Sequence, residues 1–203
     1  MIFFNGLFLG FLIAAPVGPI GVLCIQRTLT KGKLSGFVSG LGAATADGFY
    51  GTVAAFGLVA ISGFLIEQQF LLRLIGGVFL LYIGVKSFRS APPTTEIAET
   101  SKRNLLQDYV TTVFLTITNP MTIISFAALF AGVGFGFSNS GFLSAISLVS
   151  GVFLGSALWW LVLSVGVTWL RSRIKNFSFS LVNKISGVVI VLFALYILGS
   201  VLR

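Results

Sequence analysis

Asp47 carries the single charged side chain between Lys33 and Glu67, within a long apolar stretch. An ionised carboxylate is costly to bury in hydrocarbon, so an acidic residue inside a membrane span usually binds ions, protons or substrates. No Lys or Arg lies mid-span to neutralise Asp47, and removal from water favours the protonated form of a carboxyl group. We therefore expect Asp47 to bind a proton or a cationic ligand. The structural alternative is that it caps free backbone N–H groups.

The sequence APVGPIG, residues 15–21, interrupts the first apolar stretch with two prolines. Pro16 and Pro19 lack the N–H group that a helix interior requires, and each disfavours helical geometry in the residue before it. We predict a broken helix whose second half presents free N–H groups at its N-terminus, where an anionic ligand binds favourably. These N–H groups belong to the residues around Gly18, Ile20 and Gly21.

A matching break is predicted at Pro120, in the second half of the chain. Proline frees the carbonyl group four residues before it, which here belongs to Thr116. Thr116 and Asn119 are polar residues in an apolar stretch and can complete a pocket from this side. The alternative is that Pro120 only kinks its helix. Broken spans at equivalent places in two repeats are the best sequence indication of a substrate site near the middle of the membrane.

Asp47 shares one face of its predicted helix with small residues, at spacings of three and four. The other residues of this face are Gly36, Gly40, Ala43, Tyr50, Gly51 and Ala54. Another helix can approach such a face closely, so Asp47 should not face lipid. Tyr50 lies one turn on and can donate a hydrogen bond to Asp47. The predicted substrate-binding residues are Pro16, Gly18, Pro19, Ile20, Gly21, Asp47, Tyr50, Thr116, Asn119 and Pro120, and Asp47 is also the predicted proton-coupling residue.

The composition is that of an integral membrane protein. Of the 203 residues, 56% are hydrophobic and only 9% are charged, whereas soluble domains carry about 25% charged residues. The absence of histidine and the single Cys24 exclude the common catalytic triads and an internal disulfide. No GxxxxGK[ST] phosphate-binding loop occurs. We expect no enzymatic activity, no bound metal and no cofactor.

Six apolar stretches are long enough to cross a membrane as helices, which takes about 20 residues each. They comprise roughly residues 2–26, 36–64, 70–88, 109–132, 141–170 and 181–202. Eleven of the 13 Lys and Arg residues fall in alternate loops, against two on the other side. The positive-inside rule places the basic loops in the cytoplasm. Both termini are then expected outside a multi-pass protein of the cytoplasmic membrane.

The two halves of the chain match in three short segments that keep their order. Residues 11–19 match 114–122, residues 35–40 match 140–145, and residues 73–84 match 183–194. Each half has three spans, so the second copy is inverted in the membrane, as in many secondary transporters. We expect an all-α protein of six transmembrane helices in two inverted three-helix repeats, with the first and fourth helices broken. The single transmembrane domain, 1–203, then divides into repeat 1 (1–89), a cytoplasmic loop (90–107) and repeat 2 (108–203).

Other polar residues within or beside the spans give weaker signals. Ser156 falls near the position equivalent to Asp47, so the carboxylate is not duplicated in the second repeat. Gln26 is expected at the membrane interface, and Asp108 at a helix N-terminus, where an acidic side chain is favourable. Trp160 is expected to fill space in the bundle, as aromatic residues often do.

The segment 15–51, APVGPIGVLCIQRTLTKGKLSGFVSGLGAATADGFYG, closely resembles the first two spans of the lysine-exporter (LysE/RhtB) superfamily. The matching positions are Pro16, Gly18, Pro19, Gly32, Gly36, Gly42 and Asp47. Residues 73–89 are similar to the family's third span, and residues 115–126 to its Asn-Pro fourth span. One departure is Val17, which lengthens the Pro-Gly-Pro motif of many members and bears on the substrate more than on the family. The resemblance implies gradient-driven export of amino acids or related small metabolites.

We therefore expect a secondary active exporter that works by proton antiport, in which Asp47 holds either a proton or the ammonium group of the substrate. A passive small-solute or cation channel and a non-transporting membrane subunit are the open alternatives. The expected partners are a small-molecule substrate, with an amino acid favoured, and membrane lipid, but not nucleic acid. The resemblance is also compatible with a homodimer.

Overall fold

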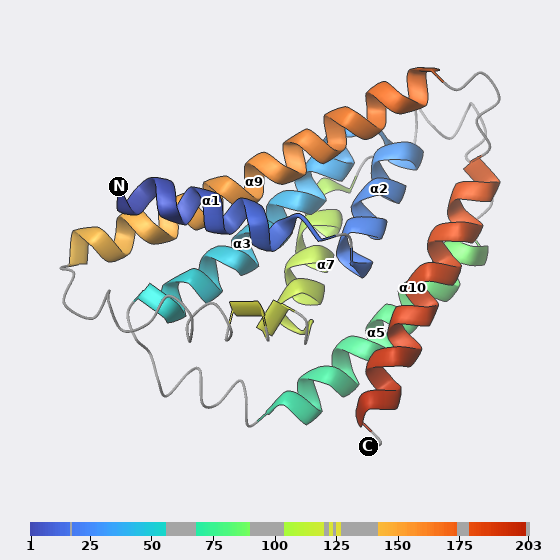
Figure 1. The fold of residues 1–203 in the computed structure, drawn as a ribbon. Coiled ribbons are helices and arrows are strands. Elements are labelled where there is room, and N and C mark those ends of the chain that lie inside the picture. Colours follow the sequence, from blue (N-terminus) through green and yellow to red (C-terminus); the bar gives the residue numbers. More distant parts are fainter. Residues whose placement is uncertain are drawn as a thin grey trace.

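The computed structural model of the chain describes residues 1–16, 18–55, 68–89, 104–119, 122–123, 125–126, 142–173 and 179–201. These residues are helical apart from short connections and contain no strand, which confirms the all-α prediction for the described part of the chain. The helices in Figure 1 are α1 (Ile2–Ala14), α2 (Pro19–Lys31), α3 (Lys33–Ala55), α5 (Gln69–Arg89), α7 (Leu105–Ile117), α9 (Phe142–Arg173) and α10 (Phe179–Val201). Val17, Pro120 and the greater part of the predicted loop 90–107 lie outside the described residues.

Three helices are long and apolar enough to cross a membrane, over Phe70–Arg89, Phe142–Arg173 and Ser180–Ser200. The pair α1 and α2 passes the same test together with a bend of 82° between the two helices, the geometry of a broken span or of a re-entrant loop. Helix α3 has 23 residues but is rich in glycine, serine and threonine, and α7 has 13 residues. The chain is therefore a multi-pass membrane protein. The total of six spans stays a prediction.

The first span is broken where the two prolines predict. Helix α1 ends at Ala14, and α2 begins with Pro19 in its first turn, where a missing N–H group removes no helical hydrogen bond. Gly18 precedes α2 with a φ of −99°, a value that is open to any residue. Helix α7 ends at Ile117 and helical residues resume at 122. A break therefore also occurs in the segment that contains Pro120.

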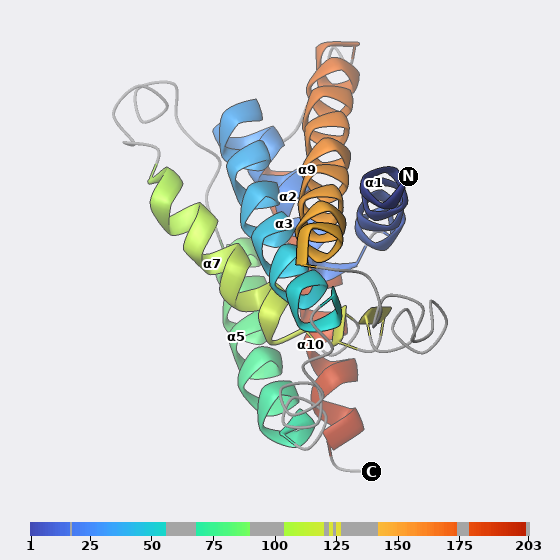
Figure 2. The ribbon, with the colours of Figure 1, turned by 90° about the vertical axis from the view of Figure 1, so that its left-hand side faces the viewer.

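Two helix pairs cross in antiparallel fashion. Helix α3 lies between α7 and α9 in Figure 2, and it meets α9 with Gly40 against Trp160 and Gly51 near Val152. Helices α5 and α10 lie side by side in both views (Figures 1 and 2). In that pair Gly77 meets Leu198, and Gly84 meets Val191. In each pair, residue numbers rise along one helix while those of the contacting residues fall along the other, so the two helices are antiparallel.

Two further pairs run parallel, and glycines bring their backbones together. Helix α1 packs along α9, where a Cβ atom on Gly6 or Gly10 would collide with the carbonyl oxygen of Leu148 or Val152. Helix α7 packs along α3, where a Cβ atom on Gly42 would collide with the carbonyl oxygen of Tyr109. Such small-residue contacts are typical of membrane helices, because they let the backbones approach closely.

The basic ends of several helices gather at one end of the bundle. The Nη1 atom of Arg171, near the end of α9, donates to the carbonyl oxygen of Leu29 at 3.0 Å. Lys31, the last residue of α2, bonds to Asp108 in the first turn of α7 at 2.7 Å. Arg171 and Lys31, two of the basic residues that predicted the orientation, therefore lie at the same end of α2.

Candidate functional site

A cavity of about 290 Å³ lies at the break between α1 and α2. Eight predicted binding residues line it: Pro16, Gly18, Pro19, Ile20, Gly21, Asp47, Thr116 and Asn119. The rest of the wall consists of Ile13, Ala14, Ala43, Thr122, Ser125, Trp160 and Phe193. The structure therefore brings both breaks and the carboxylate of α3 to one cavity, which both polar and apolar residues line.

Tyr50 and Pro120 are the two predicted residues that do not line this cavity as described. The hydroxyl group of Tyr50 donates to the carbonyl oxygen of Ile117 at 2.6 Å, and its ring stacks on Phe126 with the centroids 5.2 Å apart. The predicted hydrogen bond from Tyr50 to Asp47 is therefore wrong. The last carbonyl groups of a helix lack helical partners, and Tyr50 satisfies one at the end of α7. Pro120 lies outside the described residues.

The predicted free carbonyl group of Thr116 is also bound. It accepts a hydrogen bond from the N–H group of Asn119 at 3.2 Å. The Thr116 hydroxyl group donates to the carbonyl oxygen of Thr112 at 2.8 Å, a common use of threonine within helices. The break after α7 therefore does not present the Thr116 carbonyl group to the cavity without a hydrogen-bond partner.

The N-terminus of α2 supplies backbone donors to the cavity. The first helical bond runs from the N–H group of Val22 to the carbonyl oxygen of Gly18 at 3.0 Å. The N–H group of Gly18, which was predicted to be free, donates to the carbonyl oxygen of Pro16 at 3.0 Å. No side chain caps the helix. Among the described residues nothing accepts from the N–H groups of Ile20 and Gly21, as is usual in the first turn of a helix.

Asp47 is buried on the small-residue face of α3, as the sequence predicts, with 4% of its surface exposed. Its Oδ2 atom accepts a hydrogen bond from Ser156 Oγ of α9 at 2.6 Å. Ser156 is the one side chain in the described part of the chain that bonds to this carboxylate, and no described cation lies within ion-pair distance. Asp47 therefore lines the cavity with one carboxylate oxygen bonded to Ser156 and with no described side chain bonded to the other.

Trp160 connects this contact to the cavity wall. Its indole Nε1–H donates to Ser156 Oγ at 3.2 Å. Because the indole donates to Ser156, the single hydroxyl proton of Ser156 is directed to Asp47. The close approach of the indole depends on Gly40, where a Cβ atom would collide with the Trp160 side chain. Trp160 therefore does more than fill space, and the small-residue face of α3 makes room for it.

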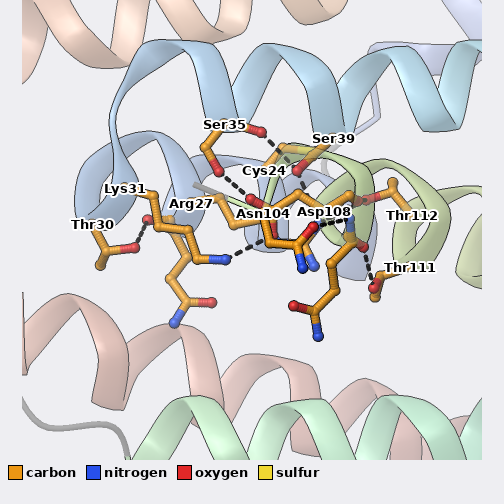
Figure 3. Close-up of polar contacts among 12 residues, drawn as sticks. Cys24, Arg27, Thr30, Lys31, Ser35, Ser39, Asn104, Asp108, Thr111 and Thr112 are labelled. Atoms are coloured by element: carbon orange, nitrogen blue, oxygen red, sulfur yellow. Dashed lines mark hydrogen bonds and ion pairs between the residues drawn. The ribbon is translucent and has the colours of Figure 1, made fainter. Parts of the chain in front are cut away.

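A second polar cluster, at the basic end of the bundle, was not predicted from the sequence (Figure 3). Arg27 Nε lies 3.2 Å from Asp108 Oδ1, with only 9% and 2% of the two side chains exposed. Lys31 Nζ lies 2.7 Å from the same oxygen, and Ser35 Oγ donates to Oδ2. Asp108 lies in the first turn of its helix, as expected. The sequence did not predict that it also forms ion pairs with Arg27 and Lys31 of α2.

Gln26 is buried against other helices, and its expected depth at the membrane interface stays a prediction. Its Nε2 atom donates to Ser87 Oγ of α5 and, at 3.0 Å, to Asn183 Oδ1 of α10. A buried amide needs such partners. Ser87 and Asn183 are polar residues near the ends of apolar helices, and such residues are the signal that could have indicated this contact.

We compared the sequence with models of protein families and with known proteins. The family model described as "LysE type translocator" matches residues 11–200. "Putative amino acid efflux protein YcgF" of Bacillus subtilis (strain 168) is 22% identical over 197 residues, which cover 96% of this chain and 94% of that protein. "Uncharacterized membrane protein YrhP" of the same strain is 25% identical over 187 residues, or 86% and 87% of the two chains. "Uncharacterized membrane protein YahN" of Escherichia coli (strain K12) is 28% identical over 109 residues, or 53% and 49%. No solved structure gives a significant match.

Proposed function

Since the chain belongs to the family of LysE type translocators, whose model matches residues 11–200, we propose that it exports amino acids or related small metabolites by proton antiport. A translocator of this family moves a solute across a membrane. The amino-acid substrate is supported by the name of the Bacillus subtilis relative, which covers 96% of this chain. The membrane is the cytoplasmic membrane, with the basic loops inside and both termini outside.

The observation that carries the proposal is that Asp47 and the N-terminus of α2 line the same cavity. An amino acid bears an ammonium group and a carboxylate, and these two elements match its charges. Asp47 accepts the ammonium group, and the N–H groups of Ile20 and Gly21 receive the carboxylate. No Lys or Arg occurs among the described residues of the wall. The helix N-terminus is therefore the anion-binding element.

Coupling to protons follows from the isolation of the Asp47 carboxylate. A buried carboxylate without a cation is costly, so it holds either a proton or the ammonium group of a substrate. The two cations exclude each other. Protonation from outside expels the substrate, and a new substrate expels the proton on the cytoplasmic side. Exchange of one for the other is antiport, provided that the cavity opens to one side at a time.

Ser156 and Trp160 act as positioning residues for this carboxylate. The hydrogen bond from Ser156 fixes Oδ2 at 2.6 Å, so the remaining oxygen is oriented to the ligand. A hydroxyl donor also stabilises the ionised carboxylate that binds the ammonium group. Trp160 fixes the direction of this hydroxyl group from the cavity wall at 3.2 Å. The substrate and the carboxylate are therefore aligned by one chain of hydrogen bonds.

The helix pairings support two inverted repeats as the basis of alternating access. In the alignment of residues 11–19 with 114–122, α1 and α7 have the same 13-residue length and equivalent ends. Helix α1 runs parallel to α9, and α7 runs parallel to α3 in the reciprocal pairing. The pairs α3 with α9 and α5 with α10 are antiparallel, as equivalent helices of inverted copies must be. We accordingly divide the transmembrane domain into repeat 1 (1–89), the loop 90–107 and repeat 2 (108–203).

The proposal is tested with purified protein in lipid vesicles. Vesicles with an acidic lumen, in a medium containing a mixture of amino acids, should accumulate the substrate above its external concentration. Protein-free vesicles with the same gradient are the control. Equilibration that ignores the pH gradient would instead identify a passive channel. No flux of any amino acid, together with a stable complex with another membrane protein, would identify a non-transporting subunit.

A further inference from the structure

We propose that the cluster of Arg27, Lys31 and Asp108 is the cytoplasmic gate of the transport pathway, and that this gate is closed in the structure. The proposal rests on the proposed function for the direction of transport, but not on the identity of the solute. We call these three residues with Ser35, Ser39 and Thr112 the inner cluster (Figure 3).

The inner cluster lies between the cavity and the basic end of the bundle. Gly21 of α2 lines the cavity, and Arg27 lies six residues further along the same helix, roughly 9 Å along its axis. Between them, Cys24 belongs to the same buried core as Ile20 and Trp160, which line the cavity. A solute that leaves the cavity along this side of α2 toward the basic end must pass the inner cluster.

Arg27 ties α2 to two other helices with one side chain. Its Nη1 atom donates to Ser39 Oγ of α3 at 2.9 Å and to Thr112 Oγ1 of α7 at 2.8 Å. The same atom donates to the carbonyl oxygen of Asp108 at 2.8 Å, and Nε pairs with the Asp108 carboxylate at 3.2 Å. Helices α2 and α3 belong to the first predicted repeat, and α7 belongs to the second. The contact therefore joins the two predicted repeats, which move relative to each other in alternating access.

The opposite side of α2 is closed by a second set of polar contacts. Gln26, the neighbour of Arg27, donates to Ser87 of α5 and to Asn183 of α10. Arg171 of α9 binds the carbonyl oxygen of Leu29. At this end α2 is thus held by polar contacts to α3, α5, α7, α9 and α10, while its N-terminus borders the cavity.

An ion pair suits a gate because both of its states are stable. In the closed state the buried charges of Arg27 and Asp108 compensate each other. In the open state water replaces each partner, and a hydrated ion pair contributes little. Lys31 already has 47% of its side chain exposed, so the inner cluster borders solvent on one side. Loss of Asp108 would leave Arg27 buried without a counter-charge, and loss of Arg27 would leave Asp108 with only the half-exposed Lys31, so either change favours the hydrated, open state.

The single cysteine of the chain reports on this gate. Cys24 lies one helical turn before Arg27 and has no exposed surface. An impermeant maleimide, added to inside-out membrane vesicles, reaches Cys24 only when the cytoplasmic side opens. We expect slow labelling of the natural chain and about tenfold faster labelling of Asp108→Asn or Arg27→Gln, for a shift of population by one decade. The double variant should label no faster than either single variant, because the buried ion pair is then absent as a whole and Lys31, which loses its partner, is already half exposed.

Lys33→Gln is the matched control, since Lys33 is exposed at the same end and belongs to no ion pair with the inner cluster. It should label like the natural chain, and thermal unfolding of each variant should show that the fold is kept. Equal labelling of all folded variants, or acceleration only from the outer side, would overturn the gate. A labelling response without any amino-acid flux would keep the gate and reject the proposed function.

Discussion

Ser156 of α9 donates a 2.6 Å hydrogen bond to Asp47 of α3, and the two residues occupy nearly equivalent positions in the predicted repeats. The antiparallel crossing of α3 and α9 is what brings such positions together. In the predicted repeats, one copy would supply the carboxylate and the other the donor that orients it. A single acidic residue can then serve a site between the two predicted halves.

Ser156→Ala should weaken substrate binding more than it slows turnover. The variant removes the one side chain that orients the Asp47 carboxylate in the described structure. We expect KM to rise about tenfold with a smaller change in kcat, because the Asp47 carboxylate that binds the substrate is no longer oriented. Ser156→Thr keeps the hydroxyl group and should restore most of the affinity. Equal losses for both variants would show that Ser156 acts only through packing.

Trp160→Phe should raise KM in the same direction but by a smaller amount, about threefold to fivefold. Phenylalanine keeps an aromatic ring in the wall of the cavity but cannot donate to Ser156, which Trp160 does at 3.2 Å. Trp159→Phe is the matched control, because the Trp159 ring contacts Phe11 instead, with the centroids 5.3 Å apart. Kinetics of vesicle uptake distinguish the two variants, and an equal effect of both would contradict the assigned role of Trp160.

Gly155→Ala should destabilise the protein, whereas Gly166→Ala in the same helix should not. A Cβ atom on Gly155 would collide with the carbonyl oxygen of Leu7, but one on Gly166 would meet nothing within 4 Å. Overpacking costs about 1–3 kcal/mol, while alanine in an open helical position stabilises by about 0.5–1 kcal/mol. Thermal unfolding in detergent measures both. Similar melting temperatures would mean that α1 does not pack on α9 as described.

Gly18→Val should keep the fold and narrow the substrate range. The φ of Gly18 is −99°, which a β-branched residue adopts, and a Cβ atom there meets nothing within 4 Å. The added methyl groups would enter the cavity, which has about 290 Å³. Larger transported solutes should therefore lose uptake before smaller ones. A uniform loss over all sizes, with a normal melting temperature, would show that Gly18 does not limit the cavity.

Local sequence was sufficient for the features that depend on nearby residues. Pro16 and Pro19 predict the end of α1 and the start of α2, since the backbone chemistry of proline acts within one turn. The spacing of Gly36, Gly40 and Asp47 predicts the buried face of α3, because helical periodicity alone determines it. The free-energy cost of burying a charged carboxylate in hydrocarbon also indicates that Asp47 faces the interior of the bundle or a cavity, whichever helix packs against it.

Contacts between distant residues were not predicted, for a physical reason. Ser156 lies 109 residues from Asp47, and Thr112 lies 85 residues from Arg27. Such pairs depend on the rotation and crossing of helices, and single-helix periodicity does not contain this information. The same holds for Tyr50, whose hydroxyl group reaches the carbonyl oxygen of Ile117 and not the carboxylate one turn away.

The Asp47→Asn variant in vesicles with an acidic lumen tests the central role of Asp47 most directly. Asparagine keeps the size of the side chain but cannot exchange a proton for an ammonium group. Accumulation of the transported amino acid should fall to the level of protein-free vesicles, while the natural chain accumulates it. Undiminished accumulation driven by the pH gradient, by a folded Asp47→Asn protein, would contradict proton coupling through Asp47.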